Sequence, residues 1–302
     1  MTPRQRALLS LQGLSVADAL GQNCFRSLRT RYDRQLPPEP WQWTDDSEMA
    51  YSIVATLLTH DSIEQDALAT SFAENFHEKR GYGPAMIYKL MPALRGGHYW
   101  QLAAKDLFDG QGSLGSGSAM RVAPLGAYFA DDLSRVALEA AKSAEVTHAH
   151  PEGVAGAIAV AVAAAVAWQH RGTMQTPQVL LKAVLPFVPE SAVREGLNQA
   201  FELPPESSLH EAVDLLGAGE RVTCMDTVPF CLWNAGRFLD DYPEAIWSTV
   251  KAGGDIDTNA AIVGGIVSLS AKDRTVPSTW ISMREPWPLW FEELLRNSQT
   301  NG

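Results

Sequence analysis

The chain is poor in cysteine and in positive charge, and both shortages narrow the functions open to it. Its 302 residues include only Cys24, Cys224 and Cys231, with no Cys-x-x-Cys pair, so no disulfide framework is expected. The net charge of −11 disfavours nucleic acid and anionic membrane surfaces as partners, because clustered Lys and Arg bind both. We therefore expect a protein of a reducing, cytoplasmic compartment.

Strand patterns, a signal peptide and a membrane span are also missing. No segment alternates polar and apolar residues over four or more positions, whereas helical periodicity recurs along the chain. Residues 7–13 lack the long apolar core of a signal peptide. The uncharged run 153–169 is rich in alanine and lies at the short end of the ~17–25 residues that span a bilayer, which favours a buried central helix.

The remaining pattern predicts an all-α protein that forms a single domain over residues 1–302, because no boundary is visible. Asp45 and Glu48 match the spacing of a capping box, so a helix is expected from position 45, after a proline-rich loop at 35–40. The other expected helices cover 3–21, 62–79, 84–93, 98–108, 132–146, 152–170, 177–185, 190–201, 208–216, 225–240, 243–251, 259–268 and 287–295.

The most informative stretch is Gly253–Thr258, which precedes an apolar helix. Two glycines permit a tight turn, and Asp255 and Asp257 then stand beside Ala260–Val267, which carries no polar side chain. Charge is costly in such surroundings without a compensating partner. A metal ion is the partner that we expect.

A second segment, Thr44–Asp46, has the same construction of threonine and aspartate at the start of an apolar helix. Helix N-termini favour carboxylates, but several converging carboxylates repel one another unless cations lie between them. Oxygen donors select Mg²⁺, Mn²⁺ or Ca²⁺ over Zn²⁺. The alternative is that Asp45 and Asp257 are helix N-caps. The predicted ligands of two divalent ions are Thr44, Asp45, Asp46, Asp255, Asp257 and Thr258.

A glycine and serine run at 110–118 leads into a short helical segment that contains Arg121. This arrangement resembles an anion-binding turn at a helix N-terminus, but it is no Walker A loop because no Gly-Lys-Ser/Thr follows. A flexible connector is the alternative. His148 and His150 lie between two expected helices, and His150 precedes a proline, which favours a turn or capping role for it.

Five segments, in this order, resemble the ADP-ribosylglycohydrolase family. They are Asp18–Gly21, Trp43–Met49, Gly115–Pro124, Thr147–Pro151 and Gly253–Thr258. The resemblance implies a compact, single-domain orthogonal bundle of helices with a dinuclear Mg²⁺ or Mn²⁺ centre. It also implies hydrolysis of the bond between ADP-ribose and a protein side chain. Members of the family act on ADP-ribosylarginine, on ADP-ribosylserine and on dinitrogenase reductase.

Carried over by position, the resemblance supports the six metal ligands and implies further roles. Asp45, Asp46 and Asp255 are the expected catalytic residues, and Asp18 is expected to be a buried hydrogen-bond acceptor that supports them. The residues expected to bind the ADP-ribose are Gly115, Ser116, Gly117, Ser118, Met120 and His148.

The chain departs from the family's pattern shortly after Asp18–Gly21. Some members carry a glutamate there, whereas this chain has no acid in Gln22–Arg26. Arginine-specific members are less uniform at this point, so the departure favours ADP-ribosylarginine as the substrate. Two other functions remain open: a binding or immunity protein that occludes an ADP-ribosyltransferase toxin, and a hydrolase of a free ADP-ribose derivative.

Overall fold

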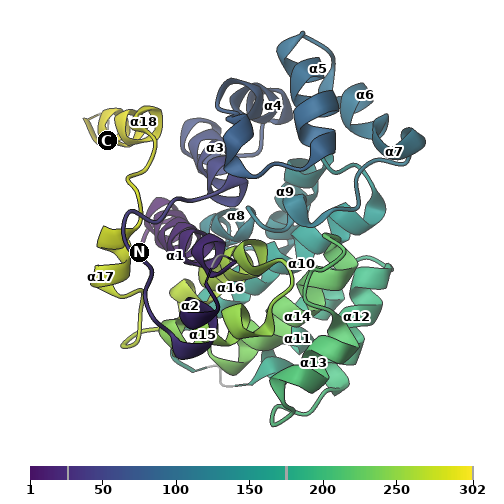
Figure 1. Ribbon diagram of the computed structural model, residues 1–302. Coiled ribbons are helices and arrows are strands. Elements are labelled where there is room, and N and C mark those ends of the chain that lie inside the picture. Colours follow the sequence, from purple (N-terminus) through teal and green to yellow (C-terminus); the bar gives the residue numbers. More distant parts are fainter. Residues whose placement is uncertain (26, 174–175, 301–302) are drawn as a thin grey trace.

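The structure, a computed structural model, describes residues 1–25, 27–173 and 176–300, and within these ranges it contains helices and isolated bridges but no β-strand (Figure 1). The predicted all-α class is therefore confirmed. The α-helices are α1 Pro3–Cys24, α2 Leu28–Asp33, α3 Asp45–His60, α4 Gln65–Glu74, α5 Met91–Arg95, α6 Trp100–Lys105, α7 Leu107–Gly110, α8 Ala123–Tyr128, α9 Leu133–Glu145, α10 Pro151–Gln169, α11 Pro177–Val184, α12 Ala192–Glu202, α13 Leu209–Leu216, α14 Cys224–Arg237, α15 Tyr242–Ala252, α16 Ile256–Ser270, α17 Ser278–Met283 and α18 Leu289–Thr300. Single turns are η1 Glu78–Arg80, η2 Met86–Leu90, η3 Ser116–Ser118 and η4 Leu185–Phe187.

Helices α1 and α16 form the most extensive helix pair and lie side by side near the middle of the molecule (Figure 1). Small residues allow this approach. A Cβ atom on Gly13 would lie 2.5 Å from the carbonyl oxygen of Gly264, and a Cβ atom on Gly21 would lie 2.7 Å from the Cα of Asp257. The absence of these side chains brings the C-terminal half of α1 against the N-terminus of α16, where three of the predicted ligands stand: Asp255, Asp257 and Thr258.

The alanine-rich helix α10 lies inside the molecule, as its composition predicts. It is long and apolar enough to cross a membrane, but 78% of its 18-residue apolar window is buried against the rest of the protein. It packs against α8, α9, α14 and α16. Burial on all sides explains why the helix has no polar face.

The segment from 84 to 110 differs from the two helices that the sequence predicts. The first begins as a π turn, η2, and continues as α5, where Pro92 has no N–H to donate. The predicted helix 98–108 breaks at Asp106 into α6 and α7, and Phe108 and Asp109 adopt left-handed backbone angles with φ of 52° and 59°. The predicted helix 62–79 likewise ends at Glu74.

Candidate active site

The turn that opens α16 depends on its two glycines. Gly253 and Gly254 have φ of 89° and 65°, and a Cβ on Gly254 would lie 1.8 Å from the carbonyl oxygen of Ala218. That carbonyl accepts hydrogen bonds from the backbone N–H of Asp255 (3.0 Å) and from Nδ2 of Asn259 (2.7 Å). The tight turn predicted from the glycine pair is present, and it presents Asp255 and Asp257 to the start of α3.

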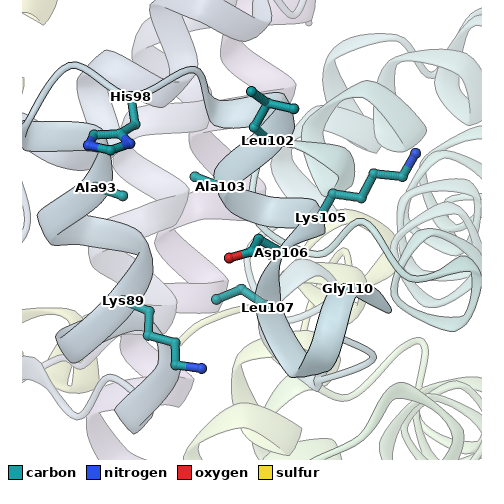
Figure 2. A pocket seen from close by; sticks show the side chains of 9 residues that line it. All are labelled: Lys89, Ala93, His98, Leu102, Ala103, Lys105, Asp106, Leu107 and Gly110. Carbon is teal, nitrogen blue, oxygen red and sulfur yellow. The ribbon is translucent and has the colours of Figure 1, made fainter.

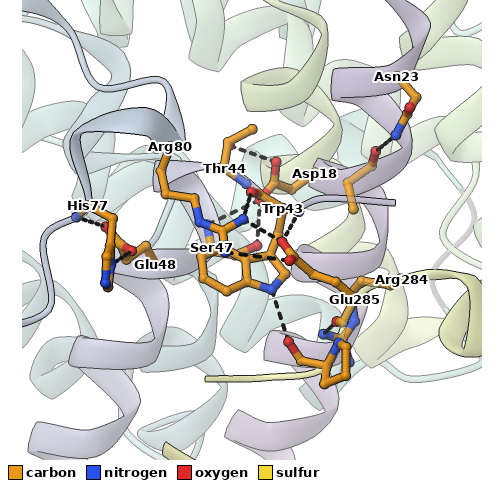
Figure 3. Close-up of polar contacts among 12 residues, drawn as sticks. Asp18, Asn23, Trp43, Thr44, Ser47, Glu48, His77, Arg80, Arg284 and Glu285 are labelled. Atoms are coloured by element: carbon orange, nitrogen blue, oxygen red, sulfur yellow. Dashed lines mark hydrogen bonds and ion pairs between the residues drawn. The ribbon is translucent and has the colours of Figure 1, made fainter. Parts of the chain in front are cut away.

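Asp18 holds the segment that begins α3 in place (Figure 3). This fully buried carboxylate on α1 accepts hydrogen bonds from Thr44 N (2.9 Å), Thr44 Oγ1 (2.7 Å) and Ser47 Oγ (2.5 Å). Thr44 Oγ1 also lies 2.8 Å from Oδ2 of Asp46. The supporting role predicted for Asp18 agrees with these contacts, because they fix the backbone at the beginning of α3.

The capping box predicted for Asp45 and Glu48 is wrong. Thr44 occupies the N-cap position of α3, and Asp45 is the first helical residue. The carboxylate of Glu48 instead accepts hydrogen bonds from Tyr82 Oη (2.8 Å) and the backbone N–H of His77 (2.9 Å), and it pairs with the His77 ring (Figure 3). Glu48 therefore ties the segment after α4 to the site.

A second clamp holds the segment that leads into α3. The guanidinium of Arg80 lies 3.4 Å from the centroid of the Trp43 ring and forms an ion pair with Glu285 (Figure 3). Glu285 also accepts a hydrogen bond from the backbone N–H of Trp43 at 2.9 Å. These contacts fix the chain immediately before Thr44.

Three carboxylates from three helices converge at this point. Oxygen atoms of Asp18, Asp46 and Asp257 lie within 4.8 Å of one another. Oδ1 of Asp46 is buried and has no hydrogen-bond partner. Within the described chain none of the site aspartates pairs with a Lys or Arg side chain. These residues are Asp18, Asp45, Asp46, Asp255 and Asp257.

Helix capping does not account for these carboxylates. Asp255 is the N-cap residue of α16 but makes no side-chain cap hydrogen bond, and Asp45 and Asp257 lie inside their helices. A buried, unpartnered carboxylate oxygen among other carboxylates is the arrangement that a cation stabilises. The donor set is all oxygen, so these residues fit Mg²⁺ or Mn²⁺.

Burial and mutual repulsion act together on the acids. Burial, followed by the charge of Asp257, raises the pKa of both Asp18 and Asp255 from 3.8 to about 7. Burial, followed by the charge of Asp257, raises the pKa of Asp45 well above the usual range, and burial, followed by the charge of Asp18, does the same for Asp46. The cluster therefore favours bound protons when no cation is present.

Divalent metal is expected to change how stability depends on pH. Because the folded-state pKa values exceed the unfolded values, their stabilising contribution is full below the unfolded pKa and is lost as pH rises through about 7. The melting temperature of metal-free protein should fall between about pH 5.5 and about pH 8. Mg²⁺ at a fixed concentration, about 100 times its Kd at about pH 8, should add about 2.7 kcal/mol at that pH and less at about pH 5.5, where protons compete for the carboxylates. Thermal shift with and without chelator measures both effects, and a metal response independent of pH would contradict them.

The acids form one end of a cavity of about 730 Å³. Asp45, Asp46, Asp255, Asp257 and Thr258 line it, together with Gly115, Ser116, Gly117, Met120 and His148. The cavity thus joins five of the six predicted metal ligands to most of the predicted ADP-ribose contacts, and its size is that of a small-molecule site. The sixth, Thr44, does not line it, and its hydroxyl contacts Asp18 and Asp46.

Ser118 is a correction to the predicted substrate contacts. Its side chain is fully buried and donates to the carbonyl oxygen of Gly153 at 2.7 Å, so it supports the glycine loop from behind and does not line the cavity. His150 is the N-cap of α10, and its Nδ1 accepts from the N–H of Glu152 at 3.1 Å, as the sequence predicts.

Two loops at the cavity were not predicted as part of the site. Gly81–Met86 lines the wall beside Asp45, and Arg221–Thr223 lies against the glycine loop, where Ser116 N donates to the Val222 carbonyl at 3.2 Å. Phe108 also lines the cavity and is 54% exposed. The glycines and proline of 81–84 are a local signal that could have indicated the first loop.

A second hollow lies between α5 and the α6–α7 segment (Figure 2). Its volume is about 610 Å³, and Lys89, His98 and Asp106 line it with several apolar residues. It contains none of the predicted metal or substrate residues. Most of the predicted site residues line the other cavity, the one that holds the aspartates.

Known proteins carry the same sequence pattern and fold. Residues 1–300 match the family profile described as ADP-ribosylglycohydrolase. The chain belongs to this family. It is 30% identical to an uncharacterized protein of Archaeoglobus fulgidus, over 89% of this chain and 88% of that protein. It is 27% identical to human ADP-ribosylhydrolase ARH3, over 80% of this chain and 74% of that protein.

A solved structure of an ADP-ribosylglycohydrolase-related protein complex has the same fold. It superposes with a TM-score of 0.68 at 22% identity and covers 98% of this chain and 96% of its own. Membership of the family shows that the protein is a hydrolase that removes ADP-ribose. The resemblance carried by the five sequence segments is confirmed.

Proposed function

We propose that the protein is a metal-dependent hydrolase that removes ADP-ribose from a modified arginine side chain. One observation carries the proposal: a single cavity joins the glycine loop to a buried carboxylate cluster in which Oδ1 of Asp46 has no partner. Two Mg²⁺ ions, or Mn²⁺, would be held by Thr44, Asp45, Asp46, Asp255, Asp257 and Thr258. Ions bound there would supply Lewis-acid chemistry for cleavage of the glycosidic bond.

The protein's own residues then bind and orient the substrate. Gly115 and Gly117 have no side chains, so the diphosphate and the ribose approach the backbone closely. The ring of Phe108, with Ala85 and Met86, provides apolar surface for the base. Asp45 or Asp46 accepts the proton of the attacking water, and Asp255 holds the opposite side of the reacting centre.

The absence of an acid at the C-terminal end of α1 favours the arginine linkage. Residues 22–25 include no carboxylate, and Phe25 is half exposed; Arg26 lies outside the described residues. An ADP-ribosylated guanidinium is already protonated near neutral pH and departs as a neutral group, because the guanidinium of arginine loses its proton only above about pH 12. A serine oxygen, by contrast, needs an acid to protonate it as it leaves.

A panel of three substrates tests this proposal. With Mg²⁺ and catalytic amounts of protein, we expect free ADP-ribose to be released fastest from an ADP-ribosylarginine protein, with less release from an ADP-ribosylserine peptide and from O-acetyl-ADP-ribose. Chelator should abolish release. Faster cleavage of either other substrate would contradict the arginine linkage, and suppression of a transferase only at stoichiometric amounts would identify an occluding protein instead.

A further inference from the structure

Arg121 is a buried cation without a carboxylate partner in the described chain. Its side chain is fully buried, and its guanidinium lies 4.6 Å from the centroid of the Phe72 ring. Nη2 donates to the carbonyl oxygen of Ser143 (3.0 Å) and to Oγ1 of Thr147 (2.8 Å). Burying a charged guanidinium without a carboxylate partner is costly in free energy. The groups that its hydrogen bonds hold in place therefore indicate its role.

The hydroxyl of Thr147 has two hydrogen-bond partners among the described residues, and both are informative. One is Arg121, and the other is Nδ1 of His148 at 2.7 Å. Arginine has no acceptor atom. Because Thr147 is fully buried, the hydrogen of its hydroxyl has only Nδ1 of His148 as an acceptor. That nitrogen must then be unprotonated, and the proton of the neutral ring lies on Nε2.

Nε2 of His148 lies where a substrate would pass. A Cβ atom on Gly117 would be 2.8 Å from this nitrogen, and a Cβ atom on Gly115 would be 3.4 Å from it. His148 lines the cavity, and its Nε2 has no hydrogen-bond partner in the described part of the chain. Burial, with a smaller contribution from Arg121, lowers the pKa of His148 to about 3, so the ring is neutral at physiological pH.

We infer that Arg121 is a positioning residue that, through Thr147, holds His148 in the Nε2–H tautomer as a donor for a substrate oxygen at the Gly115–Gly117 loop. The inference rests on the proposed function only for the identity of that oxygen, a ribose or phosphate oxygen of ADP-ribose. This role explains why a charged guanidinium is buried at this position, which the packing of apolar helices alone does not require. It also predicts that this position of the cavity selects hydrogen-bond acceptors.

The first test reads the tautomer directly in the wild-type protein. Nitrogen-15 NMR of labelled protein should show a pyrrole-type Nε2 and a pyridine-type Nδ1 for His148, assigned by comparison with His148→Gln. A protonated Nδ1 would overturn the inference. Because the tautomer is read without substrate, the result is independent of whether the hydrolysis assay succeeds.

The second test removes the relay. Thr147→Val keeps the shape but has no hydroxyl, and we expect about tenfold weaker binding of ADP-ribose and a matching rise in KM, with kcat little changed. Thr147→Ser should restore both. Thr56→Val is the matched control, because Thr56 is also buried, and among the described residues its hydroxyl bonds to the Ser52 carbonyl on α3 and not to a cavity residue. Unchanged ADP-ribose affinity in a folded Thr147→Val protein would overturn the inference.

Discussion

Replacing Asp46 with asparagine is expected to abolish metal binding and to lower the hydrolysis rate by about 10³-fold or more. Asp46 supplies the buried oxygen that lacks a partner, and its other oxygen lies 2.8 Å from Thr44 Oγ1. Asparagine preserves the shape but removes the charge that holds a divalent ion. Several kcal/mol of transition-state stabilisation depend on that ion, and each 1.36 kcal/mol is tenfold in rate.

The same substitution should stabilise the metal-free protein. Burial and the neighbouring aspartates raise the pKa of Asp46, so an ionised carboxylate there opposes folding at neutral pH. We therefore expect a higher melting temperature without metal and no further rise with Mg²⁺. Asp66→Asn is the control, because Asp66 also lies in the first turn of a helix but is not among the residues that line the cavity. Wild-type turnover by Asp46→Asn, or by Asp255→Ala, would contradict the metal assignment.

Local chemistry made much of this site predictable. The pair Gly253 and Gly254 predicts a turn with positive φ, which residues other than glycine rarely adopt. An aspartate beside an apolar helix is costly to bury, so it predicts a compensating partner. The alanine-rich sequence of α10 also predicts that this helix lies inside the molecule, because a helix without a polar face is buried. Each of these patterns lies within one short segment of the sequence, so it can be interpreted without knowledge of the fold.

Contacts between distant segments were not predictable in this way. Glu48 has the spacing of a capping residue, but tertiary contacts with His77 and Tyr82 take its carboxylate instead. Ser118 lies in a segment with the composition of a ligand-binding loop. Its hydroxyl instead donates a hydrogen bond to the carbonyl oxygen of Gly153, a contact that the local sequence does not predict. The Arg221–Thr223 loop meets Ser116 across more than one hundred residues, and no local pattern encodes that pairing.

Substrate binding and metal binding should be separable by one further substitution, Gly117→Val. A Cβ atom on Gly117 would lie 2.7 Å from Cε1 and 2.8 Å from Nε2 of His148, so the added side chain must displace either the histidine or the loop. The loop supplies the backbone approach proposed for ADP-ribose. We expect kcat/KM to fall by about 100-fold, because about 3 kcal/mol of binding is lost.

Mg²⁺ binding by Gly117→Val should remain close to that of the wild type, because the atoms nearest to a Cβ on Gly117 belong to His148 and not to an aspartate. Calorimetry with Mg²⁺ and with ADP-ribose measures the two affinities separately, and a folded Asp46→Asn protein should give the converse pattern, in which Mg²⁺ binding is lost and ADP-ribose binding is retained. If Gly117→Val bound ADP-ribose normally, the glycine loop would not be the substrate site. If it lost both ligands while folded, the loop and the aspartates would form one coupled unit, and the separation of roles argued from the cavity would fail.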